Sequence, residues 1–327
     1  MNCQNTTNTK QNKVSKEVKT IGSIEFIHPS FEQLVAKEAK MEILAEGFEW
    51  TEGPLWVEEG GYLLFSDIPP NSIFRWDDVN GLKHYLNPSG YTGKKERGGE
   101  PGANGLLLNS KGELVLCQHG DRRIAKMDAP LNSPVPKFIT LAGLYNKKRF
   151  NSPNDAAFHS TGDLYFTDPP YGLEDNINDI EKEIPFQGVY RLDSNGITHL
   201  LIDSLTRPNG IGFSPDEQKL YVSNSDVERA WWTMYTLDVT GNIVTGNIMY
   251  DATRLVGQEK GLPDGMAIDS HGNVWATGPG GIFVFNYEGQ LIGKLKTGES
   301  TANCTFDAEE KYLYITADMY LLRLPMK

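Results

Sequence analysis

The chain has 327 residues, with 43 Asp or Glu against 31 Lys or Arg, and a formal net charge of −12. A protein this acidic would repel a phosphate backbone, so the charge balance argues against nucleic-acid binding through a broad basic face. No apolar run approaches the roughly 18 residues of a membrane-spanning helix. The 3 cysteines lack CxxC or CxxH spacing, which argues against a disulfide framework or a zinc site.

The first 20 residues are rich in Asn, Thr, Lys and Gln and carry almost no large apolar side chains. Such a segment cannot bury enough surface to fold, so we expect residues 1–20 to form a flexible polar tail before a single domain at residues 21–327. Cys3 near its start fits a bacterial lipoprotein, in which a polar tether follows the lipid-modified cysteine. We therefore expect a periplasmic or cell-envelope lipoprotein anchored at Cys3, with a cytoplasmic protein carrying an ordinary tail as the alternative.

A short β-rich motif recurs along the rest of the chain, and its copies start roughly 40 to 55 residues apart, the length of a propeller blade. Turn signals such as Ser110–Gly112 and Ser160–Gly162 precede the copies. Many short, evenly spaced strands favour a closed all-β array, so six copies predict a six-bladed β-propeller. The copies are Leu63–Asp67, Leu114–Gln118, Leu164–Asp168, Leu220–Asn224, Val274–Gly278 and Leu313–Ala317.

The two ends of the chain suggest how the ring closes. The sixth blade stops at Lys327, after its motif and one further strand, whereas Met41–Ala45 is an apolar strand without a blade of its own. We predict that this N-terminal strand completes the sixth blade, which would remove an exposed sheet edge and lock the ring.

An oxygen-bearing side chain stands about ten residues before each motif, where the innermost strand of each blade should begin. If the blades are equivalent, these six side chains ring the central channel at one face. A ring of carboxylates and amides without His or Cys favours a hard, oxygen-loving cation, calcium first. Any single Asn or Asp before Gly is more often a turn residue. The prediction therefore depends on all six residues standing at the same position relative to their motifs. The six residues are Glu52, Asn104, Asn154, Asn209, Asp264 and Asn303.

Glu52 and Asp264 are the strongest candidate ligands because together they balance one divalent ion. Without a cation, two carboxylates about 4 Å apart would repel by roughly 4 kcal/mol at an effective dielectric constant near 20. Asn154 and Asn209 come next. Zn²⁺, Mg²⁺ and Mn²⁺ are the alternatives to Ca²⁺.

The motifs resemble those of the SMP-30/gluconolactonase/luciferin-regenerating family of six-bladed propellers, and most closely its bacterial gluconolactonases. The resemblance covers about residues 41–325. The resemblance is specific because several motifs occur together, whereas any one of them alone would be weak evidence for the family. They are Glu52–Trp56, Arg149–Asp155, Phe166–Gly172, Arg207–Ile211 and Leu262–Met266.

The resemblance implies a divalent cation at the hub, held by Glu52, Asn154, Asn209 and Asp264. It also implies hydrolysis of lactones, often sugar lactones such as gluconolactone. The N-terminal tail and an insert near Leu173–Gln187 depart from the animal members, which leaves the exact lactone open.

Lactone hydrolysis needs a polarised carbonyl, an activated water and a stabilised oxyanion. A hub cation can act as the Lewis acid. Calcium lowers the pKa of bound water less than zinc does, so a carboxylate base is also needed. We assign Asp264 as the base, with Asp155 as the fallback.

Substrate hydroxyls need polar contacts at the channel mouth. The candidates are Asn104, in phase with the ligands but uncharged, and Arg149, His119 and Tyr171. The alternative roles are a surface ion pair for Arg149 and a structural role for His119. The charged segment Leu173–Gln187 is either a lid or a plain solvated loop.

Two other functions compete with a lactonase. The same hub could serve a phosphotriesterase-like hydrolase, because the ligand set does not distinguish a carbonyl from a phosphoryl electrophile. A non-catalytic propeller that binds a carbohydrate or a partner protein is the second, since the fold alone is no evidence of catalysis. Gly-x-Ser-x-Gly and a GxGxxG that opens a helix are both absent, which argues against a serine hydrolase and against nicotinamide binding.

Overall fold

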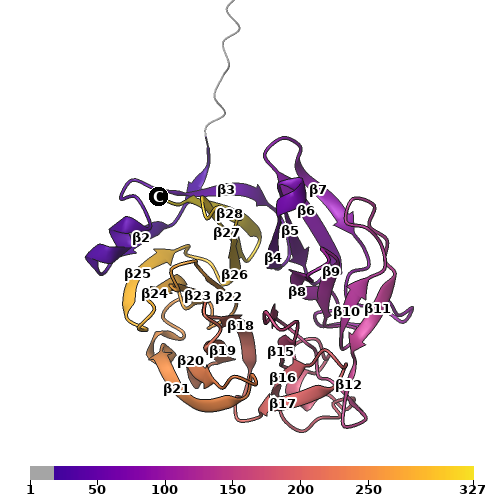
Figure 1. The fold of residues 1–327 in the computed structure, drawn as a ribbon. Helices are drawn as coiled ribbons and strands as arrows, with labels where there is room; N and C mark the ends of the chain where they lie inside the picture. Colours follow the sequence, from indigo (N-terminus) through magenta and orange to yellow (C-terminus); the bar gives the residue numbers. More distant parts are fainter. Residues whose placement is uncertain (1–17) are drawn as a thin grey trace, which may run out of the picture.

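The computed structural model describes residues 18–327 and shows six antiparallel sheets arranged around a central axis (Figure 1). The predicted all-β, six-bladed propeller is thereby confirmed. Cys3, the expected lipid-anchor site, and the rest of residues 1–17 lie outside the described residues. Within residues 18–327, none of the helices has the length and apolar character needed to cross a membrane.

The six blades follow one another along the chain, and in each of them the first strand lies nearest the axis (Figure 1). Blade 1 consists of β4 (Thr51–Val57), β5 (Tyr62–Asp67), β6 (Ser72–Asp77) and β7 (Gly81–Leu86). Blade 2 consists of β8 (Ala103–Leu108), β9 (Leu114–Gln118), β10 (Arg123–Met127) and β11 (Phe138–Ala142). Blade 3 consists of β14 (Ala156–Phe158), β15 (Leu164–Asp168), β16 (Gly188–Leu192) and β17 (Thr198–Ile202).

The second half of the ring repeats this order. Blade 4 consists of β18 (Pro208–Phe213), β19 (Lys219–Asp226), β20 (Arg229–Leu237) and β21 (Ile243–Asp251). Blade 5 contains β22 (Met266–Ile268), β23 (Val274–Gly278), β24 (Gly281–Phe285) and β25 (Leu291–Lys296). Blade 6 contains β26 (Thr301–Phe306), β27 (Tyr312–Ala317) and β28 (Tyr320–Pro325).

Short elements connect the blades. A two-stranded hairpin leads from blade 2 to blade 3, and four 3₁₀ helices lie in the connections among residues 18–327. These elements are β12 (Leu144–Tyr145), β13 (Lys148–Arg149), η1 (Pro29–Gln33), η2 (Glu58–Gly60), η3 (Asn176–Asn178) and η4 (Thr253–Leu255).

The N-terminal segment adds strands to the last two blades. β3 (Met41–Glu46) pairs antiparallel with β28 as the fourth strand of blade 6, and β1 (Thr20–Ile21) pairs with the outer edge of β3. β2 (Ser23–Phe26) pairs with β25 as a fifth strand of blade 5. Both ends of the described chain therefore meet in one sheet, and Thr20, placed in the expected tail, already belongs to a strand.

The repeated motif forms the second strand of each blade and is buried on both faces. All residues of β5, β9, β15 and β23 are buried, whereas the outermost strand β21 is largely exposed. Successive residues of a strand face opposite sides of the sheet, and here each side packs against another blade. The sequence of the strand is therefore a continuous apolar run instead of an alternation of apolar and polar residues.

Apolar contacts between neighbouring blades hold the ring together. In β5, Leu64 packs in a buried cluster with Leu116 of blade 2, whereas the preceding Leu63 packs in another cluster with Tyr314 of blade 6. Six such clusters occur among the described residues, one for each pair of adjacent blades. The core is thus a set of layers around the axis, which leaves the axis free for polar side chains.

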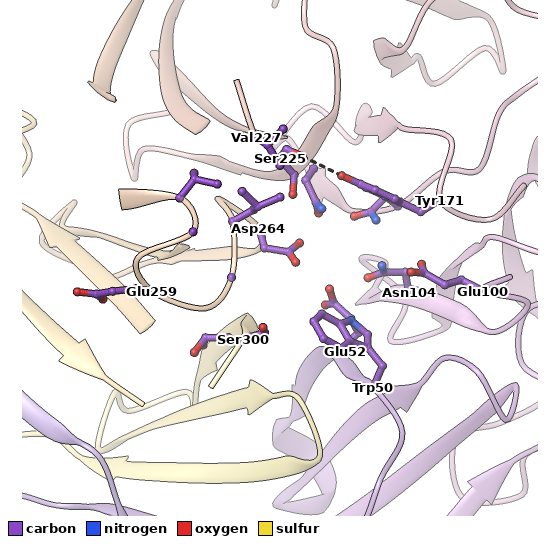
Figure 2. A pocket seen from close by; sticks show the side chains of 17 residues that line it. Trp50, Glu52, Glu100, Asn104, Tyr171, Ser225, Val227, Glu259, Asp264 and Ser300 are labelled. Atoms are coloured by element: carbon purple, nitrogen blue, oxygen red, sulfur yellow. Dashed lines mark hydrogen bonds between the residues drawn. The ribbon is translucent and has the colours of Figure 1, made fainter. Parts of the chain in front are cut away.

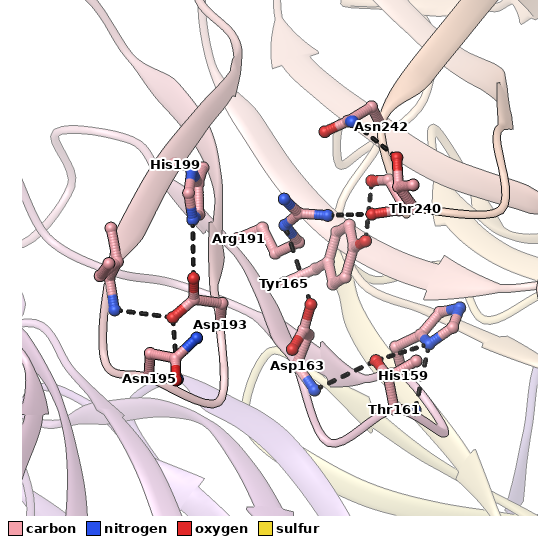
Figure 3. A network of polar contacts seen from close by, with 12 residues as sticks. His159, Thr161, Asp163, Tyr165, Arg191, Asp193, Asn195, His199, Thr240 and Asn242 are labelled. Atoms are coloured by element: carbon pink, nitrogen blue, oxygen red, sulfur yellow. Dashed lines mark hydrogen bonds and ion pairs between the residues drawn. The ribbon is translucent and has the colours of Figure 1, made fainter.

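A polar network reinforces the junction of blades 3 and 4 (Figure 3). Arg191 Nε lies 3.8 Å from Asp163 Oδ2. The Arg191 side chain also donates a hydrogen bond to the backbone carbonyl of Thr240, in the turn between β20 and β21. The hydroxyl of Tyr165 donates to the carbonyl of Gly241 in the same turn at 2.8 Å. None of these residues lines the cavity at the hub, so we assign the network to stability.

Candidate active site

Five of the six phased polar residues line one cavity of about 410 Å³ at the hub. They stand at the start of the innermost strands, either as the second residue of the strand or two residues before it. Figure 2 shows the polar ends of Glu52, Asn104 and Asp264 turned toward the centre of this cavity. The five are Glu52, Asn104, Asn154, Asn209 and Asp264.

The sixth residue, Asn303, does not line the hub cavity, although its side chain donates a hydrogen bond to Glu52. Asn303 lines a separate cavity together with Asp155 and Gly53. Burial raises the pKa of Asp155 to about 7, against hydrogen bonds from the backbone of Ala156 and Ile211 and from the Asn303 amide. Asp155, the fallback base, therefore does not face the hub cavity.

A repeated hydrogen bond anchors the backbone just before three of the hub residues. In these blades the last side chain of the motif accepts a hydrogen bond from the backbone N–H two residues before the hub residue. The N–H groups of Trp50, Ser152 and Arg207 donate to Asp67, Asp168 and Asn224 at 2.9, 2.8 and 2.8 Å. The motif therefore positions the hub residue of its own blade.

A second repeated bond ties three of the hub residues to the preceding blade. In three copies of the motif the fourth residue is a Ser or Thr whose hydroxyl donates to the backbone carbonyl of the next hub residue. Ser66, Thr167 and Ser223 donate in this way to Asn104, Asn209 and Asp264 at 2.9, 2.7 and 2.6 Å. Three of the five hub residues that line the cavity are thus linked to the blade before them.

Glycine follows several hub residues because the neighbouring backbone approaches too closely for a side chain. A Cβ atom added to Gly53 would lie 2.0 Å from the carbonyl oxygen of Asn104, and one added to Gly210 would lie 2.3 Å from that of Asp264. Gly53 also has a positive φ of 47°, which favours glycine. The glycines after Glu52 and Asn209 are therefore required by close packing of the neighbouring backbone.

The hub cavity brings together acidic side chains whose pKa values are raised. Glu52 is 2% exposed, and burial raises its pKa to about 8, against a 3.0 Å hydrogen bond from the N–H of Gly53. Burial and then the charges of Glu52, Glu100 and Asp155 raise the pKa of Asp264 well above its usual range. Neither Glu52 nor Asp264 forms an ion pair within residues 18–327, and a bound cation would supply the missing positive charge.

Three buried oxygens at the hub have no hydrogen-bond partner among residues 18–327: the Oδ1 atoms of Asn104, Asn154 and Asp264. An unsatisfied buried acceptor costs about 1–3 kcal/mol, so three of them at one cavity call for a ligand. No group of three His, Cys, Asp or Glu side chains gathers in the described part of the chain. The donor set is instead amide and carboxylate oxygen, which fits a hard divalent cation.

The expected substrate-binding residues divide into two groups. Asn104 and Tyr171 line the hub cavity, and the Tyr171 hydroxyl donates to the carbonyl of Ser225 at 3.2 Å (Figure 2). His119 is fully buried and does not line the cavity. Arg149 lies in β13 and lines a different cavity of about 300 Å³, where its side chain donates to the carbonyl of Asp121.

The insert Leu173–Gln187 does not cover the hub cavity. None of its residues lines that cavity, whereas Leu173, Glu174 and Glu181 line the cavity that contains Arg149. Ile184 is buried against blades 2 and 3. The structure therefore places this segment beside the hub cavity and not over its mouth.

Several cavity residues escaped the sequence argument because they lie outside the repeated motif. Ser225 lies in β19 directly after the motif, Glu100 precedes blade 2, and the remaining ones come from loops near blades 1, 4, 5 and 6. The only signal that the sequence offered for them was a position a few residues away from a hub residue or from the end of a motif. They include Trp50, Glu100, Ser225, Val227, Glu259 and Ser300.

Comparison with known proteins places this geometry in a family. The family described as "SMP-30/Gluconolactonase/LRE-like region" matches residues 50–318. A gluconolactonase of Zymomonas mobilis is 37% identical over 94% of this chain and 87% of its own length. The solved gluconolactonase of Xanthomonas campestris is 29% identical, with a TM-score of 0.79 over 96% of this chain and 99% of that one.

A regucalcin of Agrobacterium tumefaciens shares the fold, with a TM-score of 0.67 at 19% identity over 86% of this chain and 92% of that one. The family match spans the five phased residues of the hub cavity and the motif Leu164–Asp168, which anchors the loop that carries Asn154. The chain belongs to the SMP-30/gluconolactonase/LRE-like family.

Proposed function

We propose that this protein hydrolyses a sugar lactone of the gluconolactone type to the aldonic acid, and that it does so with a divalent cation at the hub. Membership of the family and the similarity to two gluconolactonases support the lactonase activity. The proposed cation site rests on one observation: two carboxyl groups and three amides converge on a cavity in which three buried oxygens have no hydrogen-bond partner in the described part of the chain.

Glu52, Asn154, Asn209 and Asp264 would hold the cation. When bound, it would supply a Lewis acid that polarises the lactone carbonyl and balances the charge of the two carboxylates. Ca²⁺ is the first choice because the donors are carboxylate and amide oxygens, and the regucalcin that shares the fold is described as calcium-binding. Zn²⁺, Mg²⁺ and Mn²⁺ are the alternatives to test.

Asp264 is the carboxylate that we assign as general base. It lines the cavity, and a hydrogen bond from the Asn209 side chain lowers its pKa against the larger effect of burial. Asp264 takes a proton from the water that attacks the lactone carbonyl carbon. The proton then passes to the ring oxygen as the bond between that oxygen and the carbonyl carbon breaks, which yields the open hydroxy acid.

Asn104 and Tyr171 would bind the substrate. Asn104 offers an unpartnered Oδ1 at the cavity, which can accept a hydrogen bond from a sugar hydroxyl. Tyr171 contributes a wall, and its hydroxyl is already held by the carbonyl of Ser225. The cavity of about 410 Å³ falls within the usual range for a small-molecule site.

Asp264→Asn tests this function. The variant keeps the shape of the side chain but removes the base, so gluconolactone turnover should fall at least about 100-fold while the fold persists. Asp203→Asn, at an exposed position away from the cavity, is the matched control and should be unchanged. Near-native turnover in Asp264→Asn would exclude it as the base. Activity on a phosphotriester that exceeds activity on every aldonolactone would replace the proposed substrate class.

A further inference from the structure

His119 lies directly behind the hub, between one proposed cation ligand and one carboxylate of the cavity wall. On one side the amide Nδ2 of Asn154 lies 3.3 Å from His119 Nε2. On the other side His119 Nδ1 lies 3.3 Å from Glu100 Oε2. These three side chains form a short series that ends at Asn154 Oδ1, one of the buried oxygens left without a partner among residues 18–327.

The chemistry of an amide sets the direction of these contacts. An amide nitrogen only donates, so His119 Nε2 must accept from Asn154, and the proton of the neutral ring must then reside on Nδ1. The other tautomer would donate from Nε2 and attract the amide oxygen of Asn154 toward the ring. The amide nitrogen, which does not bind cations, would then face the hub. The tautomer of His119 therefore decides which atom of Asn154 faces the cavity.

Glu100 is the acceptor next to the Nδ1 proton: its Oε2 lies 3.3 Å from His119 Nδ1, which forms no other ion pair and no well-aligned hydrogen bond among residues 18–327. Its side chain is 35% exposed at the cavity wall, so it retains the freedom to align with the ring. Pairing of one ring nitrogen with a carboxylate is the usual way in which a protein selects a histidine tautomer. Glu100 thus favours the tautomer that leaves Nε2 as an acceptor.

Packing keeps the His119 ring in place. Gly172 approaches so closely that an added Cβ would lie 2.7 Å from the Cβ atoms of both His119 and Ser152. The N–H of Gly172 donates to the Ser152 hydroxyl at 2.9 Å, which binds this loop to the one that carries Asn154. The glycine of the Phe166–Gly172 motif is therefore required by the position of the histidine.

We propose that His119 is a positioning residue for the hub: held by Glu100 with its proton on Nδ1, it accepts a hydrogen bond from the Asn154 amide and keeps Asn154 Oδ1 turned toward the cation. This inference rests on the cation site of the proposed function and adds the group that orients one of its ligands. Such supporting contacts typically change metal affinity 10- to 100-fold.

Calcium titration of the purified, chelator-treated full chain tests the proposal. His119→Phe keeps a ring but removes the acceptor, so the Kd for Ca²⁺ measured by calorimetry should rise about 10- to 100-fold. His119→Gln can still accept through its side-chain oxygen and should stay within about threefold of the wild type. The control is His199→Phe, a position in β17 that faces Asp193, and it should bind like the wild type.

A spectroscopic measurement on the wild type does not depend on whether a variant folds. Long-range ¹H–¹⁵N spectra of the histidine side chains should show His119 with its proton on Nδ1, before and after Ca²⁺ is added. A proton on Nε2 would overturn the proposal, and so would His119→Phe with wild-type affinity. A wild-type chain that binds no divalent cation would instead overturn the proposed function, and this inference with it.

Discussion

The hydroxyl of Thr167 in blade 3 donates a 2.7 Å hydrogen bond to the backbone carbonyl of Asn209, the hub residue of blade 4. The same side chain lies in the repeated motif whose last residue, Asp168, anchors the loop that carries Asn154. One strand therefore positions two proposed ligands, one in its own blade and one in the next. The geometry of the hub is built into the repeat.

Thr167→Val tests this link between blades. Valine keeps the shape of threonine but leaves the buried carbonyl of Asn209 without its donor, so the free energy of unfolding should fall by about 1–3 kcal/mol. Denaturant unfolding measures the change. Thr245→Val on the exposed strand β21 is the control and should stay within about 0.5 kcal/mol. Equal stability of the two variants would show that the inter-blade bond does not support the hub.

The metal-free protein should become less stable as the pH rises from about 4.5 to about 8. Burial raises the pKa of Glu52 to about 8 and that of Asp168 to about 7, above their ordinary values near 4. The folded state then retains protons that the unfolded state releases, so the stabilisation is complete at low pH and disappears as the pH passes the folded pKa. Each group contributes at most about 1.4 kcal/mol per pH unit.

Thermal unfolding in chelator across pH 5 to 8.5 measures this slope. Glu52→Gln removes one titrating group and should flatten the slope, with a part left that is due to Asp155, Asp168 and Asp264, whose pKa values burial also raises. Added Ca²⁺ should oppose the loss of stability at high pH because the cation favours the ionised carboxylates. Stability that rises with pH in the absence of metal would contradict the assigned charges.

Asn104→Ala separates substrate binding from cation binding. If Asn104 holds a sugar hydroxyl, the KM for gluconolactone should rise about tenfold, the equivalent of one lost hydrogen bond. The turnover number and the Kd for Ca²⁺ should both stay within about threefold. Steady-state kinetics and calorimetry on the same preparation provide the comparison. A Kd that rises together with KM would make Asn104 a cation ligand instead.

Arg149→Ala should leave lactone hydrolysis within about twofold of the wild type, because Arg149 lines a cavity other than the one at the hub. The sequence placed it at the channel mouth through its position in the Arg149–Asp155 motif. A tenfold increase in KM for gluconolactone would show that the substrate reaches this second cavity after all.

The repeat allowed the ring of blades and the position of its hub to be predicted from the sequence. Each motif is apolar on both faces because it lies between two blades, as Leu63 and Leu64 do. Once six copies are aligned, the residue at the start of each innermost strand falls at an equivalent place on the axis. Five side chains met at one cavity as that phase indicated, whereas Asn303, in the same phase, lies at a separate cavity.

Residues outside the repeat could not be placed in this way. His119 and Gln118 are adjacent in sequence, yet whether a residue at the end of β9 faces the cavity or lies behind Asn154 depends on the loop after the strand. Glu100 belongs to a long connection with no periodicity. The strands Thr20–Ile21 and Ser23–Phe26 exist because blades 5 and 6 offer edges to pair with, a tertiary condition that no local pattern reveals.

Gluconolactone hydrolysis by the chelator-treated chain, before and after Ca²⁺ is added back, is the most direct test of the hub. We predict that activity falls to the background rate in chelator, and that about one Ca²⁺ per chain restores it in the wild type but not in Glu52→Gln. Full activity without any divalent cation, or equal restoration of Glu52→Gln, would contradict the proposal.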